Sequence, residues 1–185
     1  MTRHGRSAEA RRFETLTRRV FGYGLALLVF AIDRGIKAFL LGPVALDRVD
    51  AIRLLPLFDL RFMPNSGVSL GLFTASTEHM RLILIAVTGV IALGVAAWLS
   101  VERRRTDVIG LGLVLGGALG NIYDRVVQGY VIDYADLHIG EWRPFLIFNF
   151  ADAAITFGVL ILLARSLLSG EKPAKTGANT PTENS

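Results

Sequence analysis

The chain has 185 residues, of which 52% are hydrophobic, with a mean hydropathy of +0.47 and a formal net charge of +4. This length suits one domain, and the hydropathy is high for a soluble protein. The absence of cysteine excludes disulfides, thiolate nucleophiles and cysteine-ligated metals. The three histidines, His4, His79 and His138, are scattered outside the apolar stretches, so a zinc site is not expected.

Four apolar stretches reach the length that a bilayer requires, about 20 residues. They cover approximately residues 20–41, 81–100, 107–128 and 145–168. The first is too long for the core of a signal peptide and lacks a small-residue cleavage site, so we expect it to be retained. The pattern predicts an all-α membrane protein with a four-helix transmembrane bundle over residues 18–169. Polar, low-complexity tails at 1–17 and 170–185 are expected to be disordered.

The placement of the charges predicts the orientation in the membrane. Arginines cluster before the first stretch and at 103–105, between the second and third stretches, and further basic residues follow the fourth. The other two connections carry mixed charge. The positive-inside rule therefore places both termini in the cytoplasm. A basic tract could also bind nucleic acid, but beside an apolar span it more often marks topology, so no nucleic-acid partner is expected.

The outer half of the first stretch carries Asp33 and Lys37, spaced four apart with the acid first, which is the favourable order for a helical ion pair. Two interpretations remain open. The residues could form a self-neutralised pair near the interface, with Lys37 reaching outward. Alternatively, Asp33 could orient a residue of a functional site.

The connection at 42–80 is expected on the outer side. Alternating apolar and polar residues at 57–62 predict a short strand or hairpin. Asn65 and Gly67 then suit a turn, or a backbone that approaches another group closely.

The second stretch has no charge between its ends and is expected to be a packing helix. In the third, Gly112, Gly116 and Gly120 recur every fourth residue, a spacing that lets another helix approach closely. Polar residues follow on one predicted face, namely Asn121, Asp124 and Arg125. They could form a neutralised structural pair or part of a site.

Two carboxylates lie near the predicted outer surface. Asp133 follows the third stretch, and Asp152 lies within the fourth, where a carboxylate costs up to roughly 2.5–3.5 kcal/mol. Asn149 precedes Asp152 by three residues and would share its helical face. Two carboxylates that share one proton can activate water and protonate a leaving amine, as in aspartic proteases.

Two other functions fit parts of this pattern. Polar groups within spans also occur in transporters and proton relays, although transporter sites tend to lie at the midplane between repeats, and no repeat is evident. A Ser–Lys protease would use Lys37 as the base and Ser66 or Ser69 as the nucleophile. Asp33, one turn from Lys37, argues against a neutral lysine.

Five segments in order resemble motifs of one family. They are Asp33–Lys37 for D-x-x-x-K, Asn65–Gly67 for N-x-G, Gly116–Arg125 for G-G-A-x-G-N-x-x-D-R, Gly129–Tyr134 for G-x-V-x-D-[FY], and Phe148–Asp152 for F-N-x-A-D. Together they resemble the lipoprotein signal peptidases (signal peptidase II), bacterial inner-membrane aspartic proteases. The chain departs from the family at Arg34, where glutamine is usual, and at Val68–Leu70, after the N-x-G motif.

The resemblance implies that Asp133 and Asp152 are a catalytic dyad. It implies supporting or substrate-binding roles for Asp33, Lys37, Asn65, Gly67, Gly117, Asn121, Asp124, Arg125 and Asn149. Its substrates are diacylglyceryl-modified prolipoproteins, cut before the lipidated cysteine, and it implies neither a metal nor an organic cofactor. A small β-cradle and a loop would lie outside the membrane between the first two helices. We expect a monomer in contact with membrane lipids, with its site near the outer face of the inner membrane.

Overall fold

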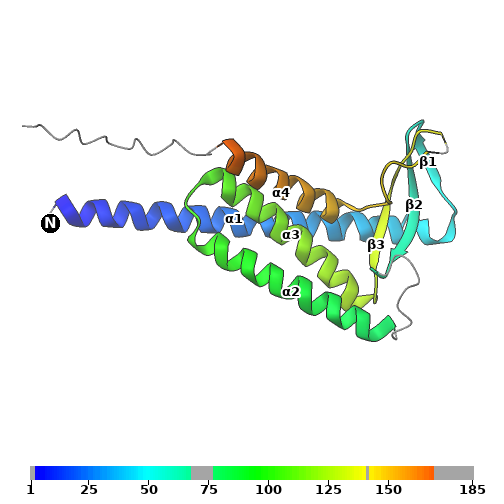
Figure 1. Cartoon of the computed structure of the whole chain (residues 1–185), viewed down its shortest axis with the longest axis horizontal. Helices are drawn as coiled ribbons and strands as arrows, with labels where there is room; N and C mark the ends of the chain where they lie inside the picture. The colour runs from blue at the N-terminus through cyan, green and yellow to red at the C-terminus, as the bar shows by residue number, and fades with distance from the viewer. Residues whose placement is uncertain (1–2, 68–76, 141, 169–185) are drawn as a thin grey trace, which may run out of the picture.

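The computed structural model describes residues 3–67, 77–140 and 142–168. In these residues four α-helices, one short 3-10 helix and three strands follow one another (Figure 1). They are α1 (Arg3–Leu41), the short 3-10 helix η1 (Leu46–Arg48), β1 (Ile52–Leu55), β2 (Phe58–Asn65), α2 (Thr77–Val101), α3 (Arg105–Val127), β3 (Val131–Leu137) and α4 (Phe150–Leu168).

The helices form a bundle in which α3 contacts α1, α2 and α4 (Figure 1). Three helices of the described chain are long and apolar enough to cross a membrane, over Glu78–Val101, Arg105–Val127 and Phe150–Leu168. Their outer faces carry large exposed apolar side chains, such as Leu93 and Leu167, as lipid-facing helices do. The fourth predicted span, in α1, is not among these three, so the structure supports three of the four predicted spans.

The short strand or hairpin predicted at 57–62 is confirmed as a hairpin, and it belongs to an antiparallel sheet of order β1-β2-β3 at one end of the bundle (Figure 1). In the β2–β3 register Asp59 lies opposite Asp136, and a bulge between Leu60 and Met63 shifts the pairing. The sheet joins the bundle through an apolar cluster that includes Leu40 of α1 and Tyr134 of β3.

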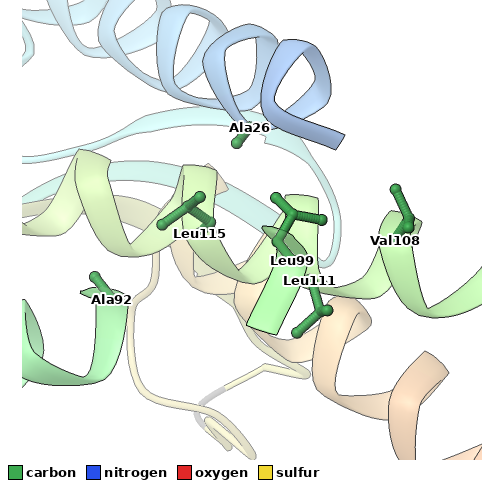
Figure 2. Packing of buried hydrophobic residues seen from close by; sticks show 6 residues of the cluster. All are labelled: Ala26, Ala92, Leu99, Val108, Leu111 and Leu115. Carbon is green, nitrogen blue, oxygen red and sulfur yellow. The ribbon is translucent and has the colours of Figure 1, made fainter. Parts of the chain in front are cut away.

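Small residues let the helices pack closely. A core of Ala26, Ala92, Leu99, Val108, Leu111 and Leu115 joins α1, α2 and α3 (Figure 2). A Cβ atom at Gly116 would lie 2.5 Å from the Ala26 carbonyl oxygen, and one at Gly117 would meet the Ala151 carbonyl oxygen. The prediction that the glycines of the third stretch serve close helix packing is therefore confirmed.

Two boundaries differ from the sequence expectation. Residues 3–17, expected to be disordered, begin α1, since residues 6–21 contain neither glycine nor proline and are rich in helix-forming Ala, Arg, Glu and Leu. α4 begins at Phe150 rather than near residue 145, because Pro144 and a β-bridge between Phe148 and Ala135 hold the preceding segment extended. Residues 68–70 and 170–185 lie outside the described residues.

Candidate active site

Asp133 and Asp152 lie at the sheet end of the bundle and are linked through two asparagines. The Asn149 Nδ2 donates to Asp133 Oδ1 at 2.6 Å and to Asn121 Oδ1 at 3.2 Å. The Asn121 Nδ2 in turn donates to Asp152 Oδ1 at 2.8 Å. Asp133 and Asn149 are fully buried, whereas Asp152 is partly exposed. The structure thus brings together two carboxylates, from β3 and α4, around a shared amide pair.

Asn149 caps α4, which corrects the expectation that it shares a helical face with Asp152. The Asp152 backbone N–H donates to Asn149 Oδ1 at 2.9 Å, and the Asn149 N–H donates to Asp152 Oδ2 at 3.2 Å. This reciprocal pattern is a capping box, with Asp152 in the position that Glu or Gln usually occupies. Asp152 is therefore fixed in the first turn of α4, at its end rather than within it.

The remaining N–H groups at the start of α4 find acceptors on other elements. The Phe150 N–H donates to the Tyr134 hydroxyl at 3.1 Å, and the Ala151 N–H donates to Asp33 Oδ1 at 3.2 Å. Sequence reasoning missed Tyr134, although it directly follows Asp133 in the motif. These bonds tie α1 and β3 to the helix that carries Asp152.

Asp133, expected just beyond the third apolar stretch, belongs to the strand β3. The adjacent strand supplies a second amide to it, since Asn65 Nδ2 donates to Asp133 Oδ2 at 2.9 Å. The Asn65 side chain is itself oriented by the Gly67 N–H, which donates to Asn65 Oδ1 at 2.8 Å. Gly67 has a φ of 78°, a conformation that favours glycine, so the N-x-G motif is a turn that aims an amide at Asp133.

Burial raises the pKa of the Asp133 carboxyl to about 6. The hydrogen bonds from Asn65 and Asn149 lower this pKa, and the nearby charge of Asp152 raises it. A carboxyl group that exchanges its proton near neutral pH beside a second carboxyl group is suited to acid–base chemistry.

Lys37 is completely buried between two carboxylates. Its Nζ lies 2.8 Å from Asp33 Oδ2 and 2.7 Å from Asp124 Oδ2. Lys37 therefore does not reach outward to the interface, and Asp33 both pairs with it and caps α4. Such a buried ion pair is costly to break from one side. An ammonium that donates to two carboxylates has no free lone pair with which to activate Ser66, and Ser69 lies outside the described residues.

Asp124 takes its partners from α1 rather than from Arg125. Besides Lys37 it binds the Arg34 guanidinium, which stacks 4.3 Å from the Tyr123 ring centroid. Asp124 Oδ2 also accepts the Ile132 N–H at 3.2 Å, which fixes the start of β3. Arg125 instead donates to the Asn121 carbonyl oxygen at 3.4 Å. Of the residues expected to support the site, Asp33, Lys37 and Asp124 thus bond to one another and to the elements that carry the two aspartates.

Two grooves open at the aspartates and share the wall Pro144–Leu146. The first, of about 500 Å³, is lined by Met63, Pro64, Asn65, Ser66, Asp133, Arg143, Pro144, Phe145, Leu146 and Ile147. The second, of about 560 Å³, is lined by Leu137, Pro144, Phe145, Leu146, Phe148, Asp152, Ala153, Thr156 and Phe157. Among the described residues, no group of three His, Cys, Asp or Glu side chains could hold a metal ion.

These features define a membrane protein with three apolar helices, a small antiparallel sheet and two carboxylates linked through two asparagines. The model of the family described as "Signal peptidase (SPase) II" matches residues 25–168. The chain therefore belongs to the signal peptidase II family, a family of aspartic proteases, as its sequence motifs indicated.

Named relatives support this membership, and a solved structure shares the fold. The chain is 49% identical over 158 residues to a lipoprotein signal peptidase of Sphingopyxis alaskensis, covering 85% of this chain and 91% of the relative. It is 50% identical over 153 residues to that of Rhizorhabdus wittichii, covering 83% and 89%. A bacterial membrane enzyme solved at 1.9 Å by the in meso method superposes with a TM-score of 0.69 at 22% identity, covering 81% of this chain and 94% of that one. This last likeness concerns the fold.

Proposed function

We propose that the protein is an intramembrane aspartic endopeptidase that removes signal peptides from diacylglyceryl-modified prolipoproteins by cutting before the lipidated cysteine. Family membership and the lipoprotein signal peptidases among the relatives support this activity. The observation that carries the proposal for the site is the pair Asp133 and Asp152, linked through Asn149 and Asn121.

In the proposed reaction, one carboxyl group of the dyad is ionised and takes a proton from a water molecule. The other is protonated and polarises the scissile carbonyl, so that the water oxygen attacks its carbon. Collapse of the tetrahedral intermediate breaks the C–N bond, and the dyad delivers the proton to the departing amine of the cysteine. Asn149 and Asn121 hold the two carboxylates for this exchange. The proton that the dyad holds at rest belongs to the pair as a unit, not to one aspartate.

We further propose that α1 is the fourth membrane span and that both termini lie in the cytoplasm of a bacterial cell. The placement of the arginines supports this orientation. The β1–β3 sheet would then lie as a cradle at the outer surface of the inner membrane, beside the dyad. The unit at 18–169 would act as a monomer, with the acyl chains of the substrate left among the membrane lipids. A site beside the sheet fits a protease acting at the surface better than a transporter acting at the midplane.

The test is cleavage of a diacylglyceryl-modified precursor by the purified protein. Asp133→Asn and Asp152→Asn should each lower kcat by about a thousandfold or more, because neither variant retains two carboxyl groups that can share a proton. Asp50→Asn changes an exposed aspartate between α1 and the sheet and should cut at the wild-type rate. Near wild-type cleavage by either dyad variant would contradict the assignment.

A further inference from the structure

A second cluster of charges lies on the sheet, outside the dyad. Asp59 and Asp136 are buried and face each other across β2 and β3. His138 Nε2 lies 3.3 Å from Asp59 Oδ2, while Asp136 Oδ2 has two arginine partners. These are Arg143 Nε at 3.2 Å and Arg61 Nε at 3.6 Å. One buried carboxylate, Asp136, thus holds two guanidinium groups at the sheet surface.

The two arginines differ in how they bind Asp136 and in what they face. Arg143 Nε donates a hydrogen bond to Asp136 Oδ2, whereas Arg61 Nε, at 3.6 Å, makes an ion pair without a hydrogen bond. Their side chains are 39% exposed for Arg61 and 41% for Arg143, and both approach Asp136 through Nε. Only Arg143 lines the first groove, together with Asp133. Binding through Nε leaves the two terminal nitrogens of a guanidinium available for another acceptor. A fixed cation therefore stands in the same groove as one of the proposed catalytic carboxyl groups.

The linings of the two grooves indicate which part of a substrate each would take. The second groove follows α4 past Thr156 and Phe157 and is largely apolar, which suits the hydrophobic signal peptide within the bilayer. The first groove follows β2 past Pro64 to Ser66 and contains Asn65, Asp133 and Arg143. It suits the polar chain that continues outward beyond the lipidated cysteine.

We propose that Arg143 is a specificity-determining residue that binds the substrate segment just after the lipidated cysteine, and that it favours acidic over basic side chains there. The inference rests on the proposed function and adds a charge preference to it. Asp136 holds the guanidinium in place, so the preference does not depend on ordering a flexible side chain. Opposite charges attract in this half-exposed groove, and a lysine of the substrate would be repelled.

The experiment uses lipidated precursors that differ only in charge. Asp, Asn or Lys is placed at the second or third residue after the cysteine, one position at a time, and kcat/KM is measured with the full-length protein. Wild type should cut the Asp precursor about tenfold better than the Lys precursor at one of these positions or both, a difference of about 1.4 kcal/mol. High salt should shrink the ratio, because the groove is partly exposed.

Variants of the two arginines separate a specificity role from a structural one. Arg143→Gln should bring the kcat/KM values of the Asp and Lys precursors together, and Arg143→Glu should reverse the preference. Arg61→Gln removes the other partner of Asp136 and should keep the preference. Thermal unfolding of each variant shows that it is folded.

Two results would overturn the proposal about Arg143. One is equal cleavage of the Asp, Asn and Lys precursors by wild type at both positions. The other is loss of the preference in Arg61→Gln to the same extent as in Arg143→Gln, which would make it a property of sheet stability. Failure of wild type to cut any lipidated precursor would instead refute the proposed function, and this inference with it.

Discussion

The Asp133 carboxylate is surrounded by neutral donors, which sets it apart from the other buried acids nearby. Asn65 and Asn149 donate to it, whereas Asp33 and Asp124 receive the ammonium of Lys37. Amide donors orient a carboxylate without adding a full positive charge that would hold it permanently ionised. Burial then keeps the pKa of Asp133 at about 6, so near neutral pH its carboxyl group can both accept and donate a proton.

This raised pKa predicts how stability depends on pH. The pKa of Asp133 is about 6 in the folded protein, against 3.8 for an ordinary aspartate, so between these values the folded state binds more protons than the unfolded state. The contribution of Asp133 to the free energy of unfolding should therefore decrease as the pH rises from about 4 to about 6. Asp133→Asn should remove that contribution, as measured by thermal unfolding in detergent at pH 4.5 and 6.5.

The exposed variant Asp50→Asn serves as the control and should keep the wild-type dependence. An identical change of melting temperature between the two pH values in wild type and Asp133→Asn would contradict the expectation.

The sequence indicated which residues gather at this candidate site, but not which hydrogen-bond and ion-pair partners they have. Asp133, Asp152 and Asn149 are conspicuous because polar groups in or beside an apolar run are costly. Asp124, in contrast, was expected to pair with its neighbour Arg125, yet it binds Arg34 and Lys37. Those partners are 90 and 87 positions away, and helical spacing carries no information about contacts between distant helices.

At the scale of single elements, the start of α4 combines a helix cap with the proposed site. Asn149 is the residue in which the two meet, because its oxygen accepts the Asp152 N–H and its amide nitrogen donates to Asp133. The helix cap and the hydrogen bond to Asp133 can be separated by substitution. A serine at this position can accept the Asp152 N–H but has no amide group to donate to Asp133.

We expect Asn149→Ala to lower stability by about 1 kcal/mol through loss of the cap alone, and further through the unpaired groups it leaves. Asn149→Ser should recover most of the cap contribution. Both variants should reduce kcat/KM at least tenfold, because neither bridges the carboxylates. Thermal unfolding and precursor cleavage, measured on the same samples, test this separation. Equal melting temperatures for the Ser and Ala variants would show that the cap is not what Asn149 contributes.

The strand β3 shows why some elements could not be read from the sequence. Its first six residues, Val131–Asp136, are all buried, so its sequence lacks the alternation of apolar and polar residues that reveals a strand with one exposed face. A short, fully buried run cannot be assigned by periodicity. The hairpin strand β2 was predicted because apolar and polar residues alternate in it.

At the scale of the whole molecule, the sheet and the basic loop between α2 and α3 lie at opposite ends of the bundle (Figure 1). The four-span arrangement was predicted from four apolar stretches, and three of them meet the criteria for a span in the structure. The crossing of α1 is a proposal, which accessibility measurements can decide.

The cysteine-free chain permits such a measurement with single cysteines at matched sites. Arg19, Arg53 and Arg104 are exposed and lie in α1, in β1 and just before α3. In spheroplasts, a membrane-impermeant maleimide should label Arg53→Cys at once, and Arg19→Cys and Arg104→Cys only after permeabilisation. Labelling of Arg19→Cys from outside would show that α1 does not cross the membrane.

The hydrogen bonds at the start of α4 also bear on biosynthesis. Its first N–H groups depend on Asp33 from α1 and on the Tyr134 hydroxyl from the sheet, and unpaired buried N–H groups are unfavourable. Before α1 has docked or the sheet has paired in a nascent chain, Asp152 lies on a helix whose first N–H groups lack their acceptors. Hydrolytic competence would then arise only when insertion is complete, which would protect neighbouring membrane proteins from a half-made protease.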